Sequence, residues 1–169
     1  MAAFNALYYA RGRLRTGRKL VRYAPFFFPL DGVGRWNRVY GRQGLLQFQC
    51  VVEDRAAVRA LLNRVASSGL RSSLGVLKTF GDLASPGMLS FPRPGATLAL
   101  DFANRGAATF ALLDALESIV REAGGALYPA KDARMSPATF AAAYPRAAEL
   151  ERHVDPAFSS SFWRRVRAA

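Results

Sequence analysis

Residues 45–52 read LLQFQCVV, and this stretch decides how the rest of the chain is organised. Every second position is apolar: Leu46, Phe48, Cys50 and Val52 alternate with Gln47, Gln49, Val51 and Glu53. A period of two is typical of a strand with one face buried against a core. The stretch therefore predicts a strand whose apolar face packs on helices and whose glutamines lie on the other face.

The segments after this strand follow the same logic. Asp54 is a candidate helix N-cap, the apolar stripe of Ala57–Val65 has helical spacing, and Gly69 ends the helix. Two further strands are expected over Ser72–Phe80 and Thr97–Phe102, separated by a loop rich in proline and glycine. These segments predict a helix followed by two consecutive strands.

A second helix is expected over Ala107–Ala123, ended by Gly124 and Gly125, and a fourth strand over Ala126–Ala130 leads to Lys131. The order β-α-β-β-α-β predicts an α+β, ferredoxin-like antiparallel sheet with both helices on one face. The other face is then open. The tail, Ser136–Ala169, is expected to form short helices.

The N-terminal part divides into two pieces. Residues 1–24 pair a short apolar start, which we expect to be the end of a strand, with the basic run Arg11–Arg22. Pro25–Leu30 (PFFFPL) cannot be a central strand because prolines bracket it, and its three phenylalanines predict packing across an interface. We expect 1–24 to be a truncated lead-in segment and 25–169 to be one domain.

Composition narrows the classes of protein. The 169 residues carry a net charge of +12, which fits an anionic partner (nucleic acid or lipid) or an arginine-rich protein with an acidic partner domain. The sequence has no apolar run long enough to span a bilayer and no pattern of a secretory signal. The single cysteine permits no intrachain disulfide and no cysteine metal cage, so we expect a cytoplasmic protein without a metal.

Lysine is rare in this chain, which has only three against a large excess of arginine. Lys78 and Lys131 fall at expected strand ends, where a compact point charge is available. With Gln47 and Gln49 on one strand and Asp101 on another, they converge on the open face. This set suits a polyhydroxylated or anionic ligand; the alternative is an ordinary solvated sheet face.

Other candidates for chemistry are weaker. His153 is the only histidine and has no metal-ligand or nucleophile partner at a useful spacing, so we expect it on a helix surface. Cys50 alternates with core positions and is expected to be a small core residue. The chain has no nucleotide-binding glycine loop, no nucleophile elbow and no zinc motif.

Seven motifs in fixed order resemble a known family: PFFFPLDGVGRWNRVYG, LLQFQCVV, VLKTFG, LSFPRPGATLALDF, GGALYPAKDAR, FAAAYPR and HVDP. They are similar to the C-terminal substrate domain of FAD-linked oxidases in the vanillyl-alcohol-oxidase superfamily, the group of decaprenylphosphoryl-ribose oxidase and the aldonolactone oxidases. The resemblance extends from about Phe26 to near the end of the chain.

The resemblance implies that the open sheet face covers the flavin and forms the substrate pocket. The positions that match this lining are Gln47, Gln49, Lys78, Phe80 and Lys131. Two neighbouring positions depart from the best-known members: Thr97 stands where an Asn is found, and Ala99 where the mycobacterial enzymes carry a Cys. The implied catalytic groups are the ammonium groups of Lys131 and Lys78.

The implied function is the substrate-binding half of an FAD-dependent oxidoreductase that acts on a hydroxyl of a sugar or sugar lactone. A polyprenyl-phosphate-linked pentose is one candidate substrate. FAD would be held by a separate domain or subunit, without which this chain is expected to be inactive. A lipid-linked substrate also implies peripheral contact with the inner membrane face. The alternative is a non-catalytic module that binds an anionic glycan or nucleic acid on the same face.

Overall fold

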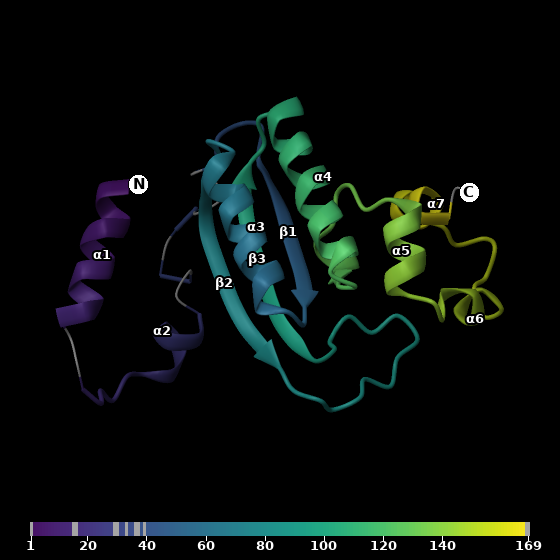
Figure 1. The fold of residues 1–169 in the computed structure, drawn as a ribbon, viewed down its shortest axis with the longest axis horizontal. Helices are drawn as coiled ribbons and strands as arrows, with labels where there is room; N and C mark the ends of the chain where they lie inside the picture. The colour runs from purple at the N-terminus through teal and green to yellow at the C-terminus, as the bar shows by residue number, and fades with distance from the viewer. Residues whose placement is uncertain are drawn as a thin grey trace.

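The computed structural model describes residues 2–14, 17–28, 31, 32, 34, 35, 38 and 40–167, and the side chains from residue 6 onward. Parts of the PFFFPLDGVGRWNRVYG motif, including Pro29 and Leu30, lie outside the described residues. The chain begins with helix α1 (Ala2–Leu14) and the one-turn helix α2 (Tyr23–Phe27). In Figure 1 α1 lies beyond the β2 edge, apart from the sheet.

The first residues correct one expectation, because Ala2–Leu14 is helical and is not the end of a strand. Alanine, leucine and arginine, which favour helices, dominate this segment, and it contains no β-branched residue. Gly12 lies in the last turn, where a glycine weakens a helix least. The apolar residues were therefore a poor guide to strand structure at this end.

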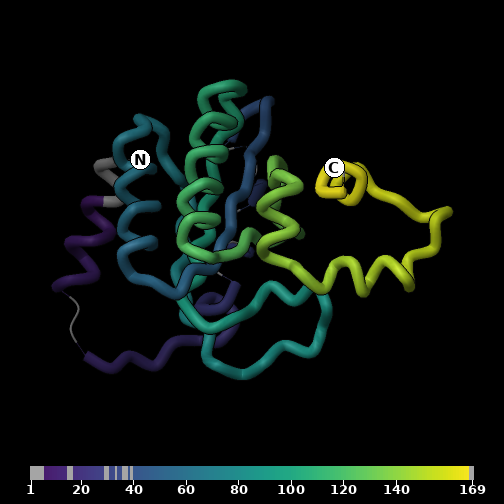
Figure 2. Tube along the Cα trace, turned by 45° about the vertical axis from the view of Figure 1, so that its right-hand side comes forward, coloured from purple at the N-terminus to yellow at the C-terminus, as the bar shows by residue number. Residues whose placement is uncertain are grey.

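The centre of the molecule is the expected four-stranded antiparallel sheet. Its elements are β1 (Leu45–Val52), α3 (Arg55–Ser67), β2 (Ser72–Phe80), β3 (Gly95–Ala103), α4 (Ala107–Glu122) and β4 (Ala126–Leu127). The strand order is β2-β3-β1-β4, so the two halves of the chain interleave. Figure 1 shows α3 and α4 over the same face of the sheet, and Figure 2 shows them side by side. The α+β ferredoxin-like fold is thus confirmed.

The alternation of β1 determines which face of the strand packs on the two helices. Phe48, Cys50 and Val52 are buried toward the helices, where Leu61 of α3 and Leu116 of α4 are fully buried. On the opposite face Gln47 and Gln49 are half-buried, whereas Val51 at the end of the strand is fully buried. The hydrophobic effect sets this orientation, since a one-residue slip would expose every core side chain.

The first covering helix begins as expected. The side chain of Asp54 accepts a hydrogen bond from the backbone N–H of Ala56 at 2.8 Å. This bond satisfies one of the backbone donors that the first turn of a helix leaves unpaired. Asp54 is therefore the N-cap of α3, directly after the end of β1.

The fourth strand is shorter than expected. Only Ala126 and Leu127 pair with β1, and Pro129–Lys131 forms a 3₁₀ turn, η2. Pro129 has no N–H to continue a ladder, which accounts for the early end of the strand. A side chain at Gly125 would lie 2.4 Å from the carbonyl oxygen of Val51, so glycine is required where the chain enters β4.

The tail forms the expected short helices, α5 (Pro137–Ala143), α6 (Ala147–Glu151) and α7 (Ser161–Arg167). Phe140 of α5 is fully buried and contacts the rings of Phe162 and Trp163 of α7 edge-on. The hydroxyl of Tyr144 donates to the carbonyl oxygen of Leu127 at 2.6 Å. The tail is therefore packed beside β4 and belongs to the same core.

Candidate functional site

A small recess of about 60 Å³ lies on the open face of the sheet. It is lined by Gln49, Val76, Lys78, Thr97, Ala99 and Lys131. All of these except Val76 were predicted from the sequence to lie at the site. The structure therefore brings much of the predicted set together at one point, from three strands and the η2 turn.

The strand register explains this convergence. Lys78 of β2 lies opposite Thr97 of β3, and Val76 lies opposite Ala99. Ala99 in turn lies opposite Gln49 of β1. Residues directly opposite each other in antiparallel strands share a face, so the recess follows from the pairing. The backbone N–H of Tyr128 donates to the carbonyl oxygen of Gln49 at 2.8 Å and places η2 beside the same strand.

The side-chain amide of Gln49 is oriented by a hydrogen bond. Its Nε2 atom donates to Oγ1 of Thr97 at 3.1 Å. Thr97 itself is almost fully buried, so it supports the recess from below more than it offers a surface. A hydroxyl is thus used here to fix a glutamine, a role that its position in the strand alone did not reveal.

Asp101 and Gln47 form a second polar pair farther along the same face. Gln47 Nε2 donates to Oδ1 of Asp101 at 3.0 Å, and the hydroxyl of Tyr40 donates to Oδ2 at 3.4 Å. Asp101 is buried, and neither it nor Gln47 lines the recess. The expectation that Asp101 converges with the lysines is therefore only partly met, because its carboxylate is engaged by these two donors.

Tyr40 is a residue that sequence reasoning missed. It lies in a 3₁₀ turn before β1, where the sequence has no periodicity, so no spacing signal connects it with Asp101. Burial and then the negative charge of Asp101 raise the pKa of Tyr40 above its ordinary value, so its hydroxyl stays protonated as a donor.

The two lysines give the recess its charge. Lys78 is exposed on β2 and Lys131 is half-buried on η2. In the described part of the chain, the ion pairs join arginines to carboxylates and none involves either lysine. Lys131 is the last residue of η2 and not of a strand, which corrects the expected location. Two ammonium groups without a carboxylate partner favour an anionic or electron-rich ligand.

Phe80 occupies a different position from the one expected. Its ring contacts Phe91 edge-on with centroids 6.0 Å apart, and Phe91 packs on Tyr128 at 4.7 Å. Phe80 is half-buried against the core and does not line the recess. It therefore forms an aromatic wall beside the site.

Cys50 is a core residue as expected, whereas His153 lies in an exposed turn and not on a helix. Cys50 is fully buried, and desolvation raises the pKa of its thiol to about 12, which makes it a poor nucleophile. His153 is exposed after α6. Among the described residues, no group of three His, Cys, Asp or Glu side chains could hold a metal ion. No helix in the described ranges is long and apolar enough to cross a membrane.

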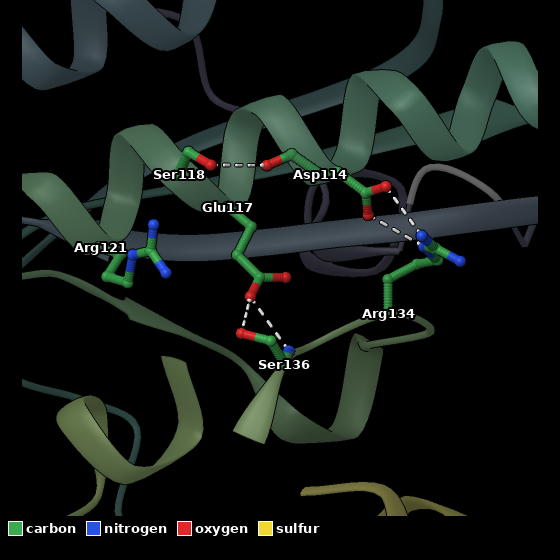
Figure 3. A pocket seen from close by; sticks show the side chains of 6 residues that line it. All are labelled: Asp114, Glu117, Ser118, Arg121, Arg134 and Ser136. Carbon is green, nitrogen blue, oxygen red and sulfur yellow. Dashed lines mark hydrogen bonds and ion pairs between the residues drawn. The ribbon is translucent and has the colours of Figure 1, made fainter. Parts of the chain in front are cut away.

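A larger hollow of about 260 Å³ lies between α4 and the start of α5, and Figure 3 shows its lining. Asp114 pairs with Arg134 at 2.7 Å, and Glu117 accepts hydrogen bonds from the N–H and the hydroxyl of Ser136 (Figure 3). Both carboxylates are therefore used to join α4 to the tail. This arrangement is structural, and size alone does not make it the candidate site.

Comparison with known proteins bears on the recess. The chain is 39% identical over 156 residues to decaprenylphosphoryl-β-D-ribose oxidase of Mycolicibacterium smegmatis, a match that covers 88% of the chain. The chain resembles an oxidase. It is also 39% identical over 166 residues to an uncharacterised protein encoded in the mprA 5′ region of Streptomyces coelicolor, with 92% of the chain covered. No protein-family model matches.

The chain is much shorter than these relatives. It spans 34% of the length of the oxidase and 42% of that of the Streptomyces protein. The similarity includes the strands that build the recess, because nearly the whole chain is covered. The similarity supports a relationship to FAD-linked oxidases and does not identify a substrate.

Proposed function

We propose that this chain supplies the substrate-facing surface of an FAD-linked oxidoreductase that acts on a hydroxyl of a sugar or sugar lactone. One observation carries the proposal: Lys78 and Lys131, two cations without a carboxylate partner in the described chain, meet beside Gln49 on an open sheet face. The similarity to a decaprenylphosphoryl-ribose oxidase makes a polyprenyl-phosphate-linked pentose the first candidate substrate.

The residues of the recess fit the ring of a flavin in their chemistry. Val76 and Ala99 lie in the two neighbouring strands yet stay partly exposed, so they offer a shallow apolar surface to a planar ring. Lys78 and Lys131 offer N–H donors beside it. The chain has no glycine-rich phosphate loop, so an FAD-binding domain or subunit would hold the pyrophosphate.

The work of this chain is binding and orientation. Bound FAD supplies the acceptor for the hydride that leaves the substrate carbon. Lys131 and Lys78 would hold the substrate oxygen by charge-assisted hydrogen bonds and stabilise the negative charge that develops on it as the hydroxyl proton passes to solvent water. Gln49, fixed by Thr97, donates or accepts at a neighbouring hydroxyl.

The exposed N-terminal segment has the composition of a surface that contacts lipid. Six Lys or Arg residues and no acidic residue precede Asp31. Leu20, Phe26 and Phe27 are exposed, and Leu20 and Phe26 line a surface hollow together with Lys19 and Arg22. We define residues 18–28 as the aromatic-basic segment and propose that it contacts an anionic lipid surface, where a polyprenyl-phosphate substrate would reside.

Co-expression with an FAD-binding domain tests the proposal. We expect a yellow complex whose flavin absorbance bleaches when the correct sugar or lactone is added without an electron acceptor. The competing function is a binding module for an anionic glycan or nucleic acid. If the chain binds no flavin-loaded partner but binds nucleic acid with a steep salt dependence, the result supports the binding module and contradicts the oxidase proposal.

A further inference from the structure

The turn that follows Lys131 is held by the side chain of Asp132. Its Oδ1 atom accepts hydrogen bonds from the backbone N–H groups of Arg134 at 2.9 Å and Met135 at 2.7 Å. Its Oδ2 atom accepts from Nη2 of Arg165 at 2.5 Å. The Asp132 side chain is 8% exposed, so three donors satisfy a nearly buried carboxylate.

Arg165 comes from α7, and its own position is fixed at several points. Its Nε atom donates to the carbonyl oxygen of Met135 at 3.3 Å, and its guanidinium lies 5.5 Å from the centre of the Phe162 ring. The neighbouring Val166 is buried in the core. The C-terminal helix therefore presents a pre-oriented guanidinium to Asp132 and to the backbone of the same turn.

Lys131 is consequently held on both sides. On its N-terminal side, its N–H donates to the carbonyl oxygen of Tyr128 at 3.0 Å, and the N–H of Tyr128 is bonded to Gln49 of β1. On its C-terminal side, the Asp132–Arg165 pair fixes the next residue. Asp132 does not line the recess, and its carboxylate is occupied by other donors, which leaves the Lys131 ammonium free of its nearest acidic neighbour in the chain.

We propose that Asp132 and Arg165 are positioning residues for Lys131, an inference that rests on the proposed function of that lysine. Through them, the C-terminal helix controls the geometry of a site whose lining it does not join. Loss of either member leaves the η2 turn free to shift and leaves the remaining charge partly buried. A shift of about 1 Å in a group that orients a reacting atom can lower a rate about a hundredfold.

The scarcity of lysine provides a test that needs neither flavin nor substrate. Reductive ¹³C-methylation of the full chain labels three lysine side chains, together with the N-terminus. We expect Asp132→Asn and Arg165→Gln to shift and sharpen the Lys131 resonance while Lys19 stays in place. Arg165→Lys adds a fourth labelled side chain with a resonance of its own, and it should restore the Lys131 resonance in part, because it keeps the charge that faces Asp132.

The control is Arg146→Gln, which breaks an exposed ion pair with Glu149 in the same tail. An unchanged Lys131 resonance in folded Arg165→Gln, or an equal change in Arg146→Gln, overturns the inference. If circular dichroism shows that Asp132→Asn does not fold, Arg165→Gln and Arg165→Lys test the inference instead. The Arg165 side chain is 36% exposed, so substitutions there should disturb folding less.

In the reconstituted complex, a second readout separates positioning from a loss of stability. We expect kcat to fall about tenfold to a hundredfold in Arg165→Gln, with KM within a few-fold of the parent. Arg165→Lys should recover part of kcat. If kcat falls only in proportion to the amount of folded protein, the result contradicts a positioning role for Arg165. If the complex has no activity, the proposed function fails, whereas the resonance test still decides the structural coupling.

Discussion

Gln47 on β1 and Asp101 on β3 lie directly opposite each other, and the amide of Gln47 donates to the buried carboxylate of Asp101 at 3.0 Å. The hydroxyl of Tyr40 approaches the second carboxylate oxygen. This relationship separates Asp101 from the two lysines of the recess. It makes Asp101 a support of the sheet face and explains why the lysines keep their charge unpaired.

Asp101→Ala should therefore act on stability. It leaves the half-buried Gln47 amide without its acceptor, at a cost of about 1–3 kcal/mol in the free energy of unfolding. Asp101→Asn keeps an acceptor and should cost less. Urea unfolding measures both variants. Equal loss in the two would show that the hydrogen bond to Gln47 does not matter.

The three lysines form a matched set for activity in the reconstituted complex. Lys131→Met should lower kcat/KM about 10²–10³-fold, because it removes a donor placed where negative charge develops. Lys78→Met, on the exposed side of the recess, should have a smaller effect. With a soluble sugar or lactone as substrate, Lys19→Met, in the aromatic-basic segment, is the control for loss of a cation. Turnover of Lys131→Met within a few-fold of the parent would remove this residue from the mechanism.

Among the acidic residues of α4, Glu117 should cause the largest loss of stability when it is replaced. Its Oε1 atom accepts from the backbone and hydroxyl of Ser136 and from the hydroxyl of Thr139 at 2.6 Å (Figure 3 shows the bonds to Ser136). Glu117→Ala leaves these donors unpaired and should lower the free energy of unfolding by roughly 1–3 kcal/mol or more. Glu122→Ala, at an exposed position of the same helix, is the control and should stay within about 0.5 kcal/mol. Similar losses in thermal or urea unfolding would contradict this role.

We expect the buried thiol of Cys50 to make the folded protein less stable at alkaline pH. Burial raises the pKa of its thiol from 9.0 to about 12, so between these values the unfolded chain releases a proton that the folded chain keeps. Stability is then fully present below pH 9 and falls as pH rises, by up to about 1.4 kcal/mol per unit for one proton. The raised pKa values of Tyr40 and Tyr144 act in the same direction.

Urea unfolding at about pH 8 and about pH 11, on either side of the ordinary thiol pKa, measures this slope, and Cys50→Ala should flatten it. The native thiol should also resist alkylation until the chain is denatured. Rapid alkylation of the folded protein at neutral pH would show that Cys50 is not held in the core.

The aromatic-basic segment predicts binding to anionic vesicles. Replacing Arg18, Lys19 and Arg22 with glutamine should weaken binding about a hundredfold at low salt, given about 1 kcal/mol per cation near such a surface. Phe26→Ser with Phe27→Ser should weaken it as well, because the rings no longer enter the interface. Leu83→Ser, at an exposed apolar site outside the segment, is the control. Vesicle flotation that shows no preference for anionic lipid would contradict the proposal.

Local pattern was sufficient for the sheet and its two covering helices. The period of two in 45–52 and the helical stripes predicted the correct faces, since burial of the apolar side contributes most of the favourable free energy of folding. Position within paired strands then placed Gln49, Lys78 and Ala99 together. The same local logic was wrong for 2–14, where apolar content suggested a strand and residue preference produced a helix.

Apolar periodicity is enough to tell which face of each strand packs on the helices and which face points away from them. How the polar groups on and beside that face are used depends on tertiary packing. Thr97 fixes Gln49, Asp101 is engaged by Gln47 and Tyr40, and Arg165 reaches Asp132. Periodicity reports contacts between a segment and its immediate neighbours. A hydrogen bond between residues 33 positions apart depends on how whole elements pack, and no local pattern encodes it.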